Sequence, residues 1–215
     1  MTTTQSSLFS EIENVIKNLN IESLSAERIE ILQPLSDFIQ SKVINKQVIR
    51  LNLICTHNSR RSHLSQVWEE TASAYFNIKN IFCYSGGKEA NAMFPMVAET
   101  LTRHGFQIKN IANVSNTVYT IKYSENEHPI IGLSKTYDDD FNTQSEFVAV
   151  MTCSQADGGC PFIAGDEKRV PITFEDPKAF DNTPQQGEKH EEKSVQIATE
   201  MISFSHKSNN NYVSK

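Results

Sequence analysis

Apolar and polar residues follow one another along the chain in blocks that are typical of an α/β protein. Short runs of strand-forming residues occur at 48–54, 81–84, 147–151 and 168–172. The run at 147–151 is continuously apolar, which indicates a strand that is buried on both faces of a parallel sheet. The pattern therefore predicts one α/β domain, with a short four-stranded parallel sheet and helices on both of its faces.

Longer stretches with apolar residues at helical spacing lie between these runs. The first is helix-like at 62–76, and a second extends from Ala92 to about His104, where Gly105 offers a stop. A closing helix is predicted near the end of the chain, because Val195, Ala198 and Ile202 fall on one face at helical spacing.

Three segments lie outside the core of this α/β pattern. Residues 1–46 have a helical pattern with a break or restart at Pro34, which predicts a helical extension. The extension could form a homodimer arm, or it could be a helical layer on its own domain. Residues 116–146 contain two β-prone runs and predict an inserted hairpin and loop. The domain proper is therefore placed at 47–205, followed by a mobile tail at 206–215.

Composition excludes several classes of partner. The 215 residues include 26 acidic and 20 basic side chains, which argues against a surface for nucleic acid or anionic membrane. No apolar stretch reaches the length of a membrane span, and the first residues lack an export pattern. A cytoplasmic location is therefore expected.

The segment that follows the first apolar run carries the candidate chemistry and reads Cys55-Thr-His-Asn-Ser-Arg-Arg-Ser62. A strand that leads through a polar turn into a helix directs the turn's N–H groups toward one anion, and such dipoles favour a thiolate. Arg61 can grip two oxyanion oxygens, Ser62 can donate to the sulfur, and Asn58 tolerates a left-handed backbone. A buried, inert cysteine is the competing interpretation. The predicted oxyanion-binding residues are Thr56, His57, Asn58, Ser59, Arg60, Arg61 and Ser62.

Two further cysteines follow another predicted strand. Cys153 comes just after the run at 147–151, and Cys160 lies seven residues later. Both should lie at the same edge of the sheet as Cys55. A zinc site lacks the usual ligand spacing and a nearby histidine, so no metal is predicted. The pair Gly158-Gly159 favours a movable segment that carries a redox thiol, and two structural thiols remain the alternative.

Four motifs occur together in this chain. They are Cys55-Thr-His-Asn-Ser-Arg-Arg-Ser62, Tyr84-Ser85-Gly86-Gly87, Cys153-x6-Cys160-Pro161 and Glu175-Asp176-Pro177. Over residues 48–204 the combination resembles the thioredoxin-coupled arsenate reductases. Those enzymes share the fold and phosphate-binding loop of the low-molecular-weight protein tyrosine phosphatases. The resemblance implies a flavodoxin-like three-layer sandwich of that phosphatase type.

The resemblance also implies a role for each motif residue. Cys55 would attack arsenate, Arg61 and the loop amides would bind the oxyanion, and Asp176 would protonate the departing oxygen. Cys153 would then attack Cys55 and release arsenite, and Cys160 would attack Cys153. Thioredoxin would reduce the final disulfide as an external reductant, so that no bound cofactor is needed.

Two other functions remain open at this point. A protein tyrosine phosphatase would use Cys55, Arg61 and Asp176 through a phosphocysteine intermediate, with Cys153 and Cys160 protecting against oxidation. A redox-sensing or oxyanion-binding protein without catalysis is the other candidate. The Asp176-Pro177 pair can project a carboxylic acid over a pocket or form an ordinary turn.

Overall fold

The computed structural model describes residues 8–160 and 162–213. The helical elements are α1 (Ser10–Lys17), η1 (Ile21–Ser23), α2 (Ala26–Ile44), α3 (Arg61–Tyr75), α4 (Pro95–Arg103), α5 (Ser154–Gly159), η2 (Pro177–Phe180) and α6 (Gln186–Val213). The strands are β1 (Ile49–Cys55), β2 (Ile81–Gly87), β3 (Gln107–Ala112), β4 (Val118–Lys122), β5 (Ile130–Gly132), β6 (Phe147–Met151) and β7 (Asp166–Pro171). None of the described helices is long and apolar enough to cross a membrane.

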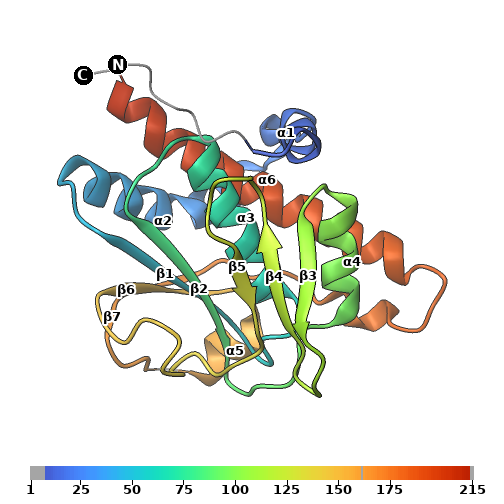
Figure 1. Cartoon of the computed structure of the whole chain (residues 1–215). Coiled ribbons are helices and arrows are strands. Elements are labelled where there is room, and N and C mark those ends of the chain that lie inside the picture. The colour runs from blue at the N-terminus through green and yellow to red at the C-terminus, as the bar shows by residue number, and fades with distance from the viewer. Residues whose placement is uncertain (1–7, 161, 214–215) are drawn as a thin grey trace.

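The main sheet has four strands in the order β2-β1-β6-β7, and all of its pairs are parallel. Figure 1 shows helices α2 and α6 above these strands and helix α5 below them. Strand β1 and strand β6 are the central pair, and β6 is buried along its whole length. The predicted four-stranded parallel sheet is confirmed.

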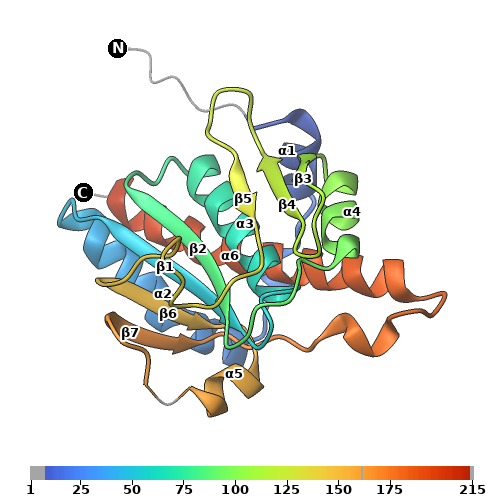
Figure 2. The same cartoon turned by 60° about the horizontal axis from the view of Figure 1, so that its bottom comes forward.

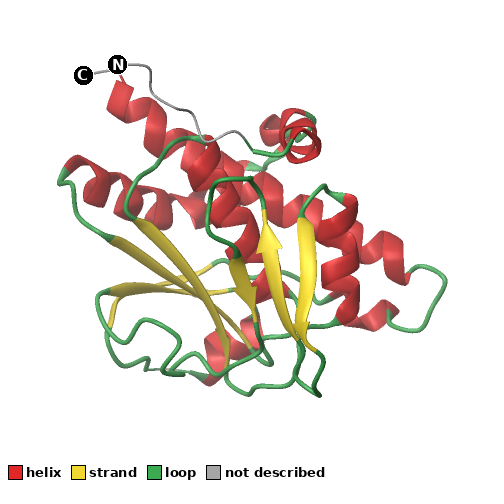
Figure 3. Ribbon diagram, viewed as in Figure 1, coloured by secondary structure: helices red, strands yellow, loops and turns green. Residues whose placement is uncertain are grey.

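The two faces of this sheet carry two separate hydrophobic clusters. Alternate residues of a strand point to opposite faces, so that Leu51 and Val150 join the large cluster while Ile54 and Met151 join the small one. Helices α2, α3 and α6 cover the large cluster, and α2 and α3 both contact β1. The short helix α5 contacts β1 and β6 on the other side, as Figures 2 and 3 show. Long helices therefore cover one face, and α5 with irregular segments covers the other.

The predicted hairpin within 116–146 is present but belongs to a larger element. Strands β4 and β5 pair antiparallel, and β3 pairs antiparallel with β4 on its other side. The resulting three-stranded sheet was not expected, because Gln107–Ala112 alternates too weakly between polar and apolar residues to indicate a strand. After Gly132 the chain leaves this sheet and runs along the loop that follows β1.

The N-terminal helices pack on their own chain. Helix α2 lies against α6, and Arg28 binds both carboxylate oxygens of Glu200 at 2.9 and 2.7 Å as well as the Thr173 carbonyl oxygen. Just before α1, the N–H of Phe9 donates to the carbonyl oxygen of Tyr123 at 2.9 Å. These contacts support the helical layer, and nothing in the described residues supports the dimer arm.

One expectation about helix continuity was wrong. Helix α2 runs unbroken through Pro34, which lies on its exposed side, where the carbonyl group that the proline leaves unpaired can face solvent. Helix α6 continues to Val213, within the predicted mobile tail at 206–215, and the mobility of that tail stays a prediction. The last two residues of that predicted tail lie outside the described residues.

The contact between Arg28 and Glu200 predicts a large loss of stability when the arginine is removed. The Glu200 side chain is only 1% exposed, so Arg28→Leu leaves a buried carboxylate without its partner. We expect the free energy of unfolding to fall by about 3 kcal/mol, measured by urea denaturation. Arg103→Leu is the matched control, because its pair with Glu191 is 43% and 41% exposed and should change stability by less than about 1 kcal/mol. Equal effects of the two variants would contradict this view of α2.

Candidate active site

The segment between β1 and α3 forms a tight loop around the sulfur of Cys55. Cys55 is the last residue of β1 and is 3% exposed, and Arg61 is the first residue of α3. The Sγ atom of Cys55 lies 3.1 Å from the Oγ atom of Ser62. The predicted thiol and hydroxyl are therefore in hydrogen-bond contact at the N-terminus of a helix.

Asn58 holds this loop in shape from its centre. Its φ angle is +43°, which is the left-handed conformation that asparagine tolerates. Its side-chain Nδ2 donates to the Oγ of Ser62 at 2.9 Å, and its Oδ1 accepts the backbone N–H of Lys135 at 2.9 Å. The asparagine thus connects the hydroxyl beside Cys55 to the segment after β5.

A second close approach comes from the end of β2. A Cβ atom built on Gly87 would lie 2.6 Å from the Asn58 nitrogen and 2.4 Å from the Glu89 carbonyl oxygen, so only glycine fits there. The next residue, Lys88, donates its N–H to the Cys55 carbonyl oxygen at 3.1 Å. The glycine motif after β2 therefore allows the chain to pack directly onto the loop.

Arg61 and Asp176 come together as the sequence predicted. The guanidinium group of Arg61 donates to the Oδ2 of Asp176 at 2.6 Å and to the carbonyl oxygen of Phe174 at 2.8 Å. The other oxygen of Asp176 accepts the N–H of Lys178, which fixes the carboxylate at the start of η2. A carboxyl group and an arginine thus lie next to each other at the helical end of the Cys55 loop.

The side chain of Arg60 makes contacts outside the loop. It donates to the Oδ2 of Asp181 at 2.5 Å, and its guanidinium carbon lies 3.9 Å from the centre of the Phe94 ring. Any contribution of Arg60 to anion binding would therefore come from its backbone N–H. Neither Asp181 nor Phe94 stood out in the sequence, because their partner is far away along the chain.

His57 and Ser59 of the loop are in contact with neighbouring segments of the chain. The His57 side chain is 40% exposed and faces Glu89, with 3.5 Å between Nδ1 and Oε2. The carbonyl oxygen of His57 accepts the hydroxyl of Ser134 at 3.1 Å, and that of Ser59 accepts the N–H of Phe94 at 2.9 Å. Contacts from outside the loop therefore reach it on several sides.

Cys153 lies against the same loop. Its Sγ atom is 3.4 Å from the Oγ1 atom of Thr56, and its side chain is fully buried in the small hydrophobic cluster that also holds Cys55. Cys160 belongs to this cluster too and is 7% exposed, and all four cysteines are free thiols. The fold therefore gathers three predicted site thiols into one small cluster, while Cys83 lies in the large one.

Buried charge lies behind the loop. Burial is the main cause that lowers the pKa of Lys135 to about 8. His63 is also buried; its Nε2 atom lies 2.9 Å from the Asn58 carbonyl oxygen, and burial followed by the charge of Lys135 lowers its pKa to about 3. His63 is therefore neutral near pH 7, and the positive charge of Lys135 contributes to keeping it so.

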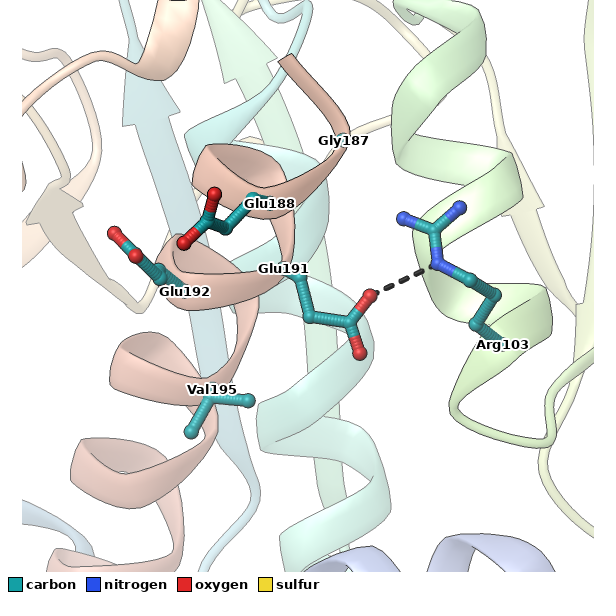
Figure 4. A pocket seen from close by; sticks show the side chains of 6 residues that line it. All are labelled: Arg103, Gly187, Glu188, Glu191, Glu192 and Val195. Atoms are coloured by element: carbon teal, nitrogen blue, oxygen red, sulfur yellow. Dashed lines mark hydrogen bonds and ion pairs between the residues drawn. The ribbon is translucent and has the colours of Figure 1, made fainter. Parts of the chain in front are cut away.

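Surface hollows occur beside Asp176 and between α4 and α6. A small one of about 280 Å³ lies beside Asp176 and is lined by Phe180, Lys189 and Lys193. A larger one of about 550 Å³ lies between α4 and α6, where Arg103 faces Glu191 (Figure 4). Among the described residues, no group of three or more His, Cys, Asp or Glu side chains is arranged to hold a metal ion.

Curated relatives of this sequence are arsenate reductases. Arsenate reductase 2 of Staphylococcus haemolyticus is 28% identical over 125 residues, which are 58% of this chain and 75% of the relative. Arsenate reductase 1 of Staphylococcus saprophyticus has the same identity and coverage. No family model matches the chain.

Solved structures with a similar fold include three of interest. An arsenate reductase in a phosphate-binding state is 17% identical, with a TM-score of 0.47 over 74% of this chain and 98% of that chain. A low-molecular-weight phosphotyrosine phosphatase from Vibrio cholerae is 12% identical, with a TM-score of 0.49 over 74% and 95% of the two chains. A thioredoxin-dependent arsenate reductase of Corynebacterium glutamicum is 16% identical, with a TM-score of 0.41 over 93% and 85%.

The four-stranded parallel sheet and the cysteine loop at its edge define an α/β protein with a thiol at the N-terminus of a helix. In its sequence, this chain is similar to two arsenate reductases at 28% identity. The resemblance predicted from the motifs is thereby confirmed.

The contacts of Asn58 predict weaker anion binding when its side chain is removed. Asn58→Ala loses both side-chain hydrogen bonds and places alanine at a left-handed φ angle. We expect its affinity for inorganic phosphate to fall about tenfold, measured by calorimetry. Asn77→Ala is the matched control, since Asn77 is exposed at a φ of +57° outside the loop. A similar loss of affinity in both variants would show that backbone strain alone matters.

The lowered pKa of Lys135 predicts that anion binding weakens in mildly alkaline solution. The amine is charged below about pH 8 and neutral above it, so its attraction for an anion is present at low pH and lost as pH rises through 8. We expect sulfate affinity to fall about fivefold between pH 7 and 9. Sulfate is chosen because it does not titrate there, and Cys55→Ser serves as the background to remove the thiol. Adding Lys135→Met should flatten the profile, and an unchanged slope would disprove the role of Lys135.

Proposed function

We propose that this protein reduces arsenate to arsenite through Cys55, Cys153 and Cys160, and that thioredoxin recycles it. The observation that carries the proposal is the position of Cys153, whose sulfur lies 3.4 Å from the hydroxyl of Thr56, the residue next to Cys55. A nucleophilic cysteine with a second thiol against its own loop fits reduction better than simple hydrolysis. The curated relatives named arsenate reductase point the same way.

The first step uses the loop of Cys55. The thiolate of Cys55 forms a bond to the arsenic atom of arsenate, and the departing oxygen leaves as water after taking a proton from Asp176. Arg61 and the N–H groups of the loop bind the remaining oxygens, as donors at a helix N-terminus do for tetrahedral anions. Ser62, 3.1 Å from the sulfur, stabilises negative charge on Cys55 when it later leaves.

The second step would release arsenite. The thiolate of Cys153 attacks the sulfur of Cys55, a disulfide forms, and the electron pair of the sulfur–arsenic bond passes to arsenic, which leaves as arsenite. Both thiols belong to the same small buried cluster, so the approach requires only a local movement. Cys160 then attacks Cys153, frees Cys55 and leaves a Cys153–Cys160 disulfide for the two thiols of thioredoxin.

The last exchange requires helix α5 to open. Cys153 and Cys160 flank this helix at its two ends. Seven residues of helix span about 10 Å, whereas the Cα atoms of a disulfide are roughly 4.4–6.8 Å apart. The oxidised enzyme would therefore present a rearranged 153–160 segment to thioredoxin. The reducing cytoplasm is the compartment that suits such thiols.

A protein tyrosine phosphatase is the second candidate. The pair formed by Arg61 and Asp176, with 2.6 Å between Nη2 and Oδ2, favours it because phosphoryl transfer to Cys55 needs a proton donor and an anion clamp but no second thiol. In that case Cys153 and Cys160 would protect Cys55 from oxidation. In both candidate functions we assign the reaction to residues 47–205, with the N-terminal helices packed on them.

Replacing single cysteines separates the two functions. We expect Cys153→Ser to lose at least 99% of arsenate-dependent NADPH oxidation in an assay coupled to thioredoxin and thioredoxin reductase, while it keeps aryl phosphate hydrolysis. Cys160→Ser should complete one turnover and then stop, and Cys55→Ser should lose both activities. Cys83→Ser is the matched control, because Cys83 is a buried thiol of the large cluster and has no place in the relay.

Two outcomes would contradict the reductase proposal. Multiple turnovers by Cys160→Ser would mean that this thiol is not part of the recycling path. No arsenate turnover by the native chain, together with phosphate release that depends on Cys55, would assign the phosphatase function instead.

A further inference from the structure

Arg169 holds the C-terminal end of helix α5. It lies on β7, and its guanidinium group donates to the carbonyl oxygens of Asp157 and Cys160. The same group binds the carboxylate of Asp157 at 2.8 and 3.1 Å. One side chain therefore satisfies two carbonyl groups that no helical N–H can reach and also neutralises the nearby acid.

Helix α5 depends on such support because its own sequence is a poor helix former. It contains six residues, Ser-Gln-Ala-Asp-Gly-Gly, and ends in two glycines. At its N-terminal end the N–H of Ala156 donates to the sulfur of Cys153 at 3.3 Å. Among the six residues of this helix, Ala156 alone is buried. The contacts of Arg169 are therefore a large share of what keeps α5 folded.

We infer that Arg169 is a positioning residue of the thiol relay, which holds Cys160 away from Cys153 until the last exchange and so sets the redox equilibrium of this pair. The inference rests on the proposed function in one respect, that Cys153 and Cys160 become a disulfide. Because α5 must open for this bond to form, every contact that Arg169 makes with the folded helix stabilises the dithiol. Arg169 thereby keeps Cys153 reduced and available for the adduct on Cys55.

The step that Arg169 opposes has a simple balance. In the relay, the thiolate of Cys160 forms a bond to the sulfur of Cys153, the Cys55–Cys153 bond breaks, and Cys55 leaves as a thiolate that takes up the proton lost by Cys160. In a glutathione buffer, the two thiols of Cys153 and Cys160 lose two electrons and two protons. One glutathione disulfide gains them and becomes two glutathione thiols.

The test measures this equilibrium directly in the full-length chain. A Cys55→Ser, Cys83→Ser background leaves Cys153 and Cys160 as the only thiols. The protein is equilibrated in buffers of reduced and oxidised glutathione, and the fraction of disulfide is read by alkylation and mass. We expect Arg169→Gln to raise the equilibrium constant for oxidation about tenfold, which corresponds to a reduction potential roughly 30 mV more negative. Arg169→Lys should give an intermediate value, because lysine supplies one donor group in place of a fork.

Arg50→Gln is the matched control. Arg50 lies on β1 and its side chain binds the exposed carboxylate of Glu146 at 3.3 Å instead of a residue of α5, so its loss should leave the redox equilibrium unchanged. Asp157→Asn weakens the ion pair with Arg169 from the other side and should also raise the equilibrium constant for oxidation. This variant keeps the inference testable if Arg169→Gln does not fold. An unchanged or smaller oxidation constant in folded Arg169→Gln, or in Asp157→Asn if it alone folds, would overturn the inference.

This measurement needs neither arsenate nor thioredoxin. A shift in the equilibrium without arsenate turnover by the native chain would leave Arg169 in its role and remove the proposed function. Arsenate turnover by the native chain, together with an unshifted equilibrium in Arg169→Gln, would support the proposed function and remove the role of Arg169.

Discussion

The candidate site depends on the two hydrogen bonds of the Asn58 side-chain amide. This amide binds the hydroxyl of Ser62 on one side and the N–H of Lys135 on the other, across a backbone held at a left-handed angle. The amide therefore fixes the loop, the start of α3 and the segment after β5 relative to one another. Because a Cβ atom on Gly87 would lie 2.6 Å from the backbone nitrogen of the same residue, the loop has little room to adopt another shape.

The sequence was informative wherever chemistry and local pattern coincide. The four strands of the main sheet, the loop from Cys55 to Ser62 and the approach of Asp176 to Arg61 were all predicted. Each depends on a short run of residues, or on a motif whose members have one plausible chemical partner. Residues that act through a distant neighbour were missed, as the contact of Asp181 with Arg60 illustrates.

The errors in fold prediction have a common physical origin. A strand such as β3 with an exposed surface shows little alternation, and a proline on the solvent side of α2 does not end a helix that tertiary contacts hold. In both cases packing against other parts of the chain decided the structure. The pairing of Arg28 with Glu200 likewise joins segments that are 172 residues apart, so no local pattern could reveal it.

The sheet also separates two hydrophobic clusters of unequal size. The large cluster, with the N-terminal helices and α6, lies on one face, and the small cluster with Cys55, Cys153 and Cys160 lies on the other. Local opening on the smaller side can therefore proceed while the larger side remains intact, as happens in proteins that unfold in separate cooperative units. In the proposed relay, such a molecule would rearrange its thiols at each cycle without exposing its main core to aggregation or proteolysis.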